Sequence, residues 1–519
     1  MSLAERTLVF VGAACLIAGA TAVASAQETG PKTLGLVDAV TLTLQRQPGI
    51  RLAEEQLRFA EGSLEATLGA FDLQWGSVLS ASRERSPFLP APTGPGSNDN
   101  RVDRLDYGFQ ATKLFRGGLL LTPSLDLAKS NSNLSLRPEN RARVSFTLRQ
   151  PLLRGKGEEG VGAPSRAATI DRDAAGLELR HAVSLSVVET VIAYWRHVGE
   201  LRRLEIARDS EARFVDLQSS AEKLLAAREI AAVDIRQLSA VVASRRLSRI
   251  EAEQSVYEAR VQLAVAAGLD ASMIGDFERP GDALPSALPE GGWTPNLPAL
   301  IDLALRQRSD LQAARARQTS AGILLRASHN ATRPTLDVLV GTSYQGATDR
   351  SGLSGFLDPL ANNVSGPSAS ASLVFGWPGA NRTALGRMAE TQAALRQSEI
   401  LQADLERRIG ARVALVMNNV SRSRERVAAA REACNLYRET LAAERQRQQL
   451  GLSSLLDVIN TEDRLNDSLT EEVAAEVDYA EAVATLRFET GTLVRLGASG
   501  HEVDFALLTT PPAADPPGR

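Results

Sequence analysis

The chain has 519 residues and a formal net charge of −4, with acidic and basic residues interleaved along its length. This balance is typical of solvated helix surfaces and provides no basic patch for nucleic acid, so we expect no nucleic-acid partner. Only 4% of the residues are aromatic, and this composition suits helices packed through small and aliphatic side chains.

Residues 1–26 have the form of a secretory signal peptide. Arg6 precedes an apolar run, and Ala24-Ser25-Ala26 supplies the small residues of a cleavage site. After residue 26 no run of 18 or more apolar residues remains, which excludes a membrane-spanning helix. The mature protein is therefore expected to leave the cytoplasm, and any membrane insertion would have to use strands.

Residues 27–270 are predicted to form a first repeat that runs from helix into strands and back into helix. Apolar residues follow helical spacing over residues 36–68, and the period changes to two at Phe71. Strands are expected at about 72–83 and 141–150, and residues 103–128 alternate in the same way, which would add a hairpin. Long helices are expected at about 165–227 and from there to about 268.

These alternating segments favour a membrane barrel over a soluble sheet. They are about ten residues long, they carry aromatic residues near their ends, and polar loops on one side contrast with a tight glycine turn at Gly117-Gly118 on the other. After them, Gly155, Gly157 and Gly160 satisfy a G-x-G-x-x-G spacing. Two glutamates would face the phosphates there and no parallel β-α-β pattern surrounds the motif, so no cofactor is expected.

A Pro/Gly linker at 271–296 precedes a second repeat at 297–493. Its apolar residues stand in the same relative places as those of the first repeat, which indicates an internal duplication. Strands are expected at about 335–345 and 368–377. The remaining residues, 494–519, are rich in proline and are predicted to be a disordered tail.

The second repeat ends in a long helical hairpin whose tip lies near Gly451. Apolar or small residues recur at alternating spacings of three and four from Val413 to Leu441, as in a coiled-coil seam. The helix that approaches Gly451 would be roughly 100 Å long, which is more than a compact domain can bury. The hairpin is therefore expected to protrude from the rest of the protein.

The fold class predicted from this organisation is an α+β membrane protein in which a β-barrel is continued by long helices. Backbone groups in lipid must all be paired, which requires a closed barrel. One chain offers too few strands for a useful pore, so a cyclic oligomer that shares one barrel is the simplest solution. Small polar residues on the inward face would keep the barrel wet.

The chain resembles the TolC family of outer-membrane efflux proteins over nearly all of its mature length. The resemblance rests on the duplication, the strands inside each repeat, the segment Gln150-Pro151-Leu152-Leu153-Arg154-Gly155, and the pattern Gly451-x5-Asp457-Val458-Ile459. It implies a homotrimer in outer-membrane lipid, a twelve-stranded barrel with four strands per protomer, and a helical periplasmic tunnel. With the hairpin at 103–128 the trimer would have eighteen strands.

The resemblance also implies partners and a gate. The partners are a periplasmic adaptor and an inner-membrane transporter. Family members carry acidic rings at the closed periplasmic end, where Asp457 and Asp234 match the acids and Asn460 stands in place of a second acid. Three copies of Asp457 would repel one another and attract cations. The alternative is that Asp457 only stabilises the first turn of the return helix.

The expected adaptor-docking tip comprises two turns. Gly451, Leu452 and Ser453 match the small, apolar turn that the adaptor contacts in the family. The corresponding first-repeat turn departs from the pattern, because Arg228, followed by Glu229, stands where a glycine is usual.

The function predicted from these features is passive export through an outer-membrane exit duct that opens on adaptor docking. An enzyme is not expected, because the four histidines have no metal-ligand spacing and no nucleophile elbow or phosphate loop is present. The alternative is a coiled-coil structural or adhesive protein on the cell surface, which would have no need of duplicated amphipathic strands.

Overall fold

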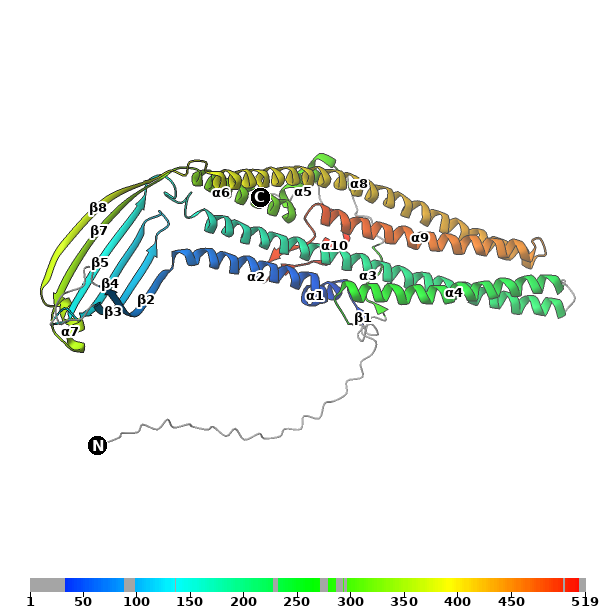
Figure 1. The fold of residues 1–519 in the computed structure, drawn as a ribbon. Coiled ribbons are helices and arrows are strands. Elements are labelled where there is room, and N and C mark those ends of the chain that lie inside the picture. Colours follow the sequence, from blue (N-terminus) through cyan, green and yellow to red (C-terminus); the bar gives the residue numbers. More distant parts are fainter. Residues whose placement is uncertain are drawn as a thin grey trace, which may run out of the picture.

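The computed structural model describes residues 33–87, 99–135, 137–226, 232–270, 279–285, 293, 296–497 and 500–512. Figure 1 shows an elongated molecule with one sheet at one end and long helices that run away from it. The predicted signal peptide lies outside the described residues. Among the described helices, none is long and apolar enough to cross a membrane.

The first half of the chain contains two helices, four long strands and two further helices. Residues 36–68 form two helices because Pro48 begins the second of them, where its missing N–H costs nothing. The elements are α1 (Leu36–Arg46), α2 (Pro48–Leu68), β2 (Leu73–Pro87), β3 (Asp99–Leu114), β4 (Leu120–Ser132), β5 (Glu139–Pro151), α3 (Ala163–Ala226) and α4 (Ala232–Ala266).

The second half has the same order of elements with two long strands instead of four. These elements are α5 (Leu297–Gln307), α6 (Ser309–Ala331), β7 (Thr335–Thr348), α7 (Leu353–Leu357), β8 (Val364–Gly376), α8 (Arg382–Gln449) and α9 (Leu455–Glu489). The 68 residues of α8 give it a length of about 100 Å.

All six long strands form one antiparallel sheet in the order β2-β3-β4-β5-β7-β8. The expectation of four strands per protomer is therefore wrong. The segment 103–128 belongs to β3 and β4, which are inserted between β2 and β5 in full register. The pairing of β5 with β7 joins the two halves of the chain.

The sheet has one apolar and one polar face across all six strands. Trp75 and Leu373, near opposite edges, are 65% and 64% exposed on the apolar face. The strand registers place on that face Trp75, Leu79, Tyr107, Phe109, Leu125, Leu127, Val144, Phe146, Val340, Tyr344, Leu373 and Phe375. The opposite face carries Gln74, Ser80, Gln110, Thr112, Thr122, Ser124, Ser145, Thr147, Ser343, Ser370 and Ser372.

The glycines of the G-x-G-x-x-G spacing form the joint between β5 and α3. The N–H of Gly157 donates to the carbonyl of Gly117 at 3.1 Å, and the N–H of Gly155 donates to the Asn330 side chain at 2.8 Å. A Cβ on Gly118 would lie 2.6 Å from the Gly155 carbonyl oxygen. The glycines therefore allow the β3–β4 turn to pack closely on the joint.

The helices nearest the sheet lie side by side in the order α2, α3, α6 and α8. Beyond them, α3 with α4 and α8 with α9 form two hairpins that extend to the far end of the molecule (Figure 1). The largest buried cluster lies midway, where Tyr194 and Trp195 of α3 are fully buried among residues of α1, α4 and α9.

Each hairpin returns to a helix corner, and a glycine permits the close approach. Gly268, after α4, has φ +71°, and a Cβ there would lie 2.7 Å from the Cα of Gln47 between α1 and α2. Gly491, after α9, also has φ +71°, and its Cβ would lie 2.9 Å from the carbonyl carbon of Gln307 beside the α5–α6 corner. The two halves thus use the same contact.

The described residues after α9, 494–497 and 500–512, form strands, a helix and packed contacts, so the prediction of a disordered tail is wrong for them. Strands β9 (Arg495–Gly497) and β10 (Gly500–Glu502) pair, and α10 (Phe505–Thr509) buries Leu507 and Leu508. The buried side chain of Arg487 donates to the Thr510 carbonyl at 2.8 Å. Burial, with a smaller effect of Arg495, lowers the pKa of Arg487 to about 10.

Two glycines with the same backbone angle allow a test of this packing. Both glycines have φ +71°. A Cβ added to Gly451 would have no atom within 4 Å, whereas a Cβ added to Gly491 would lie 2.9 Å from the carbonyl carbon of Gln307. Gly451→Ala is expected to cost about 1 kcal/mol from the left-handed backbone alone. Gly491→Ala should lower the free energy of unfolding by at least twice as much, as measured by thermal unfolding of the purified protein. Equal losses would contradict close packing at the α5–α6 corner.

Candidate functional site

The tip between α8 and α9 is closed by backbone hydrogen bonds. The N–H of Leu452 donates to the Arg447 carbonyl at 2.9 Å, and the N–H of Gly451 donates to the Gln448 carbonyl at 3.0 Å. This pair is a Schellman motif, which requires a left-handed residue and so explains Gly451. Leu450 and Leu452 are 66% and 67% exposed. The tip therefore presents apolar side chains on a rigid turn.

Asp457 closes the first turn of α9. The Ser454 hydroxyl donates to the Asp457 carboxylate at 2.6 Å, the Ser454 N–H donates to it at 3.1 Å, and the Asp457 N–H donates to the Ser454 hydroxyl at 3.2 Å. These bonds form a capping box. They also lower the pKa of Asp457, the hydroxyl of Ser454 having the largest effect. Asp457 is thus an exposed carboxylate that is ionised at neutral pH.

The structure describes only some of the other predicted gate and tip residues. Asn460 is exposed and lies three residues after Asp457, on the same side of α9. Asp234 lies in the first turn of α4. Arg228 and Glu229 lie outside the described residues.

The two hairpins meet through α9. Ile459 is 4% exposed and packs with Phe214 of α3 and Leu238 and Val242 of α4. Because Ile459 holds its side of α9 against α3 and α4, this contact fixes which way the rest of α9 faces. Asp457 and Asn460 lie on the side of α9 turned away from Ile459, and both are exposed.

A known protein family matches the second half of the chain. Residues 300–492 match the family model described as outer membrane efflux protein. The second half of the chain is therefore similar to outer-membrane efflux proteins.

Solved structures of outer-membrane channels share the fold of this chain. The outer-membrane channel OprN has a TM-score of 0.64 at 16% identity, with 88% of this chain and 90% of OprN covered. VceC from Vibrio cholerae has a TM-score of 0.64 at 18% identity, with coverages of 88% and 96%. The open state of MtrE from Neisseria gonorrhoeae has a TM-score of 0.60 at 15% identity, with coverages of 88% and 88%. A comparison with curated protein sequences found no match.

Glu462 is a residue of the site that the sequence interpretation missed. Its side chain is 3% exposed, it accepts from Arg213 Nε of α3 at 3.0 Å, and it also accepts from Arg445 of α8. One carboxylate of α9 thus joins both hairpins. The sequence does contain a signal for this role, because Glu462 lies at helical spacing from Val458 and Leu465 on the buried side of α9. An acid at a seam position requires cationic partners.

A second charged contact lies beside Glu462. Arg245 of α4 pairs with Asp463 of α9, and the guanidinium of Arg245 lies 5.3 Å from the ring centre of Phe214. Burial raises the pKa of Asp463, and Arg245 opposes that shift. Arg213, Glu462, Arg445, Arg245 and Asp463 form what we call the hairpin network.

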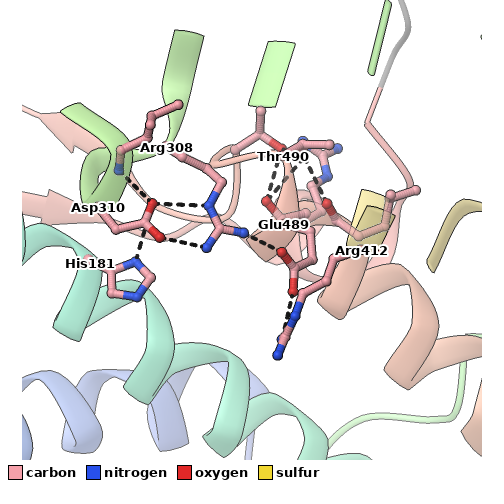
Figure 2. A network of polar contacts seen from close by, with 10 residues as sticks. His181, Arg308, Asp310, Arg412, Glu489 and Thr490 are labelled. Atoms are coloured by element: carbon pink, nitrogen blue, oxygen red, sulfur yellow. Dashed lines mark hydrogen bonds and ion pairs between the residues drawn. The ribbon is translucent and has the colours of Figure 1, made fainter. Parts of the chain in front are cut away.

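A buried charge network holds the α5–α6 corner on the end of α9, as Figure 2 shows. Arg308 donates to both carboxylate oxygens of Asp310, at 3.0 and 2.8 Å, and to Glu489, which also accepts from Arg412 at 3.3 Å. Burial alone would raise the pKa of Asp310, but Arg308 lowers it below its usual value. We call these four residues the corner network.

His181 of α3 lies at the edge of the corner network. Its Nδ1 is 4.0 Å from Asp310 (Figure 2). The centre of its ring lies 5.6 Å from that of Phe488. Burial lowers the pKa of His181, although Asp310 acts in the opposite direction. In the part of the chain that the structure describes, no group of three or more His, Cys, Asp or Glu residues is placed to hold a metal ion.

Proposed function

We propose that this chain is an outer-membrane efflux protein, three copies of which form a passive exit duct from the periplasm to the exterior. The observation that carries this proposal is the two-faced sheet joined directly to helices about 100 Å long. Its apolar face suits lipid and its polar face suits a wet lumen. The long helices would then continue the lumen into the periplasm as a tunnel.

The duct works in this proposal with a periplasmic adaptor and an inner-membrane transporter. The rigid turn of Gly451, Leu452 and Ser453 exposes the side chains of Leu450 and Leu452. These apolar side chains support docking of the adaptor there, because they have no partner within the described chain. Arg228 and Glu229 would form the second docking turn. Their charges would give that turn a different contact from the first.

The gate in this proposal lies at the helical end, where Asp457, Asn460 and Asp234 face one another across copies. Its support is the exposed, ionised state of Asp457 and the fixed orientation of α9 beside Ile459. Like charges brought together in a narrow lumen repel and attract cations. The hairpin network would hold the closed arrangement within each copy.

The duct is tested by its location, assembly and conductance. The protein purified from the outer-membrane fraction should migrate as a trimer and conduct ions in planar bilayers. Conductance should rise when the purified adaptor is added. A soluble monomer that conducts nothing would eliminate the duct and favour the surface coiled-coil alternative.

Asp457 offers a test of the gate that separates it from helix capping. Asp457→Asn and Asp457→Ala should both raise the resting conductance and weaken block by divalent cations, because each removes three carboxylates from the mouth. Ser454→Ala removes the capping hydroxyl and leaves the carboxylate, so it should cost about 1 kcal/mol of stability without changing block. If Ser454→Ala and the Asp457 variants behaved alike, Asp457 would be only a capping residue.

A further inference from the structure

The width of the sheet can be compared with the width of the helical layer to which it is attached. Four helices, α2, α3, α6 and α8, lie side by side next to the sheet. Packed helices lie about 8–10 Å apart, so this layer is about 36 Å wide in one copy. A barrel wall that continues it without a step needs a similar width per copy.

Six strands supply that width at an ordinary tilt. Strands lie about 4.8 Å apart, and a tilt of about 40° to the barrel axis spreads them to about 6.3 Å along the circumference. Six strands therefore cover about 38 Å and four strands about 25 Å by the same relation. The six-stranded sheet matches the four-helix layer, whereas a four-stranded sheet would not at this tilt.

The two layers also end at the same elements. The outer strands β2 and β8 each leave one edge unpaired, over 15 and 13 residues. In the helical layer the outer members are α2, which leads into β2, and α8, which follows β8. Apolar side chains are exposed on both, with Phe59 of α2 at 80% and Ile400 of α8 at 68%. One neighbour can therefore cover strand edge and helix edge together.

We infer that a second copy of this chain occupies these edges, with β2 of one copy beside β8 of the next, and that three copies close a barrel of eighteen strands. The inference rests on the proposed trimeric duct and adds its strand number. A backbone edge in lipid cannot remain unpaired. Another copy brings a matching edge, a matching apolar face and a matching helical layer.

The β3–β4 hairpin is an integral part of this wall. Tyr107 and Leu125 continue the apolar face, and Gln110 and Ser124 continue the polar face. The turn at Gly117 and Gly118 is fixed on the joint that leads into α3. At equal tilt the barrel has about 1.5 times the circumference of one without this hairpin, because circumference follows strand number.

Excision of the hairpin tests the width of the barrel. Removing residues 99–132 joins β2 to β5, whose apolar residues lie at matching levels of the sheet. Polyethylene glycols added from the exterior enter the barrel end first, so their exclusion is compared in open, conducting channels of both trimers. The wild-type trimer should admit polymers of at least 1.5-fold larger radius than the excised trimer, because side chains narrow both lumens by a similar amount. Equal cut-offs in two conducting trimers would overturn the inference but leave the duct intact.

Thiol labelling tests the same point without a deletion. Tyr107→Cys and Gln110→Cys lie on opposite faces of β3, and the native Cys434 is buried. In the membrane-embedded trimer, a water-soluble maleimide should modify Gln110→Cys at least tenfold faster than Tyr107→Cys. Equal labelling would place the hairpin outside the wall and overturn eighteen strands. A protein that neither assembles nor conducts would overturn this inference together with the duct.

Discussion

Glu462→Ala is expected to make openings of the channel about tenfold more frequent in the absence of an adaptor. The substitution removes the carboxylate that joins Arg213 of α3 to Arg445 of α8, and it leaves both guanidinium groups without that partner. Breaking a fully buried pair costs about 3–5 kcal/mol. Here the arginine side chains are 28% and 48% exposed, so solvent compensates in part. We therefore expect the closed state to lose about 1–2 kcal/mol relative to the open state. A change of 1.4 kcal/mol corresponds to a tenfold change in the ratio of the two states.

The matched control for Glu462→Ala is Glu425→Ala. Glu425 pairs with Arg422, which lies three residues earlier on α8, and their side chains are 66% and 68% exposed. Such a pair contributes about 0.5 kcal/mol or less, so resting openings should not change. Single-channel recordings of both variants provide the comparison. If Glu462→Ala assembled normally and opened no more often than Glu425→Ala, apolar contacts at Ile459 alone would hold the hairpins together.

The positions of helices and strands could be predicted because their periodicity is local. The change from helical spacing to a period of two at Phe71, and the glycine at the α8–α9 tip, each depend on a few neighbouring residues. The number of strands depends on more than local periodicity. Residues 103–128 alternate as strands do, but the resemblance implies only four strands per protomer. The pairing of β3 with β2 and of β4 with β5 resolves this, and pairing is a long-range property.

The tail and the hairpin network could not be predicted for a related reason. Proline-rich composition favours disorder, yet the indole N–H of Trp293 donates to the Pro512 carbonyl at 3.1 Å. That contact joins residues more than 200 positions apart. Likewise, the acid at Glu462 was visible on the seam, but its partners lie on two other helices. The sequence placed Asp457 correctly at the turn, and its capping role follows from the distance to Ser454.

Glu489→Ala is expected to have the largest effect on stability, a loss of about 3–5 kcal/mol, because it leaves the buried Arg308 without one of its two acidic partners. The side chains of Arg308 and Glu489 are 9% and 2% exposed, so water cannot replace the lost carboxylate. Thermal unfolding of the purified protein measures the loss. The matched control is Arg306→Ala, two residues away, whose pair with Asp302 is exposed at 69% and 60%. It should change stability by about 0.5 kcal/mol or less.

The corner of the first half provides a second comparison for the corner network. There Gln47 stands in the place of Arg308 and donates from its amide to the Ala266 carbonyl at 2.8 Å. Gln47→Ala removes a neutral hydrogen bond and should cost about 1 kcal/mol, several-fold less than Glu489→Ala. If the two variants lost the same stability, the charges of the corner network would contribute nothing beyond ordinary hydrogen bonds. The second corner would then owe its rigidity to packing at Gly491.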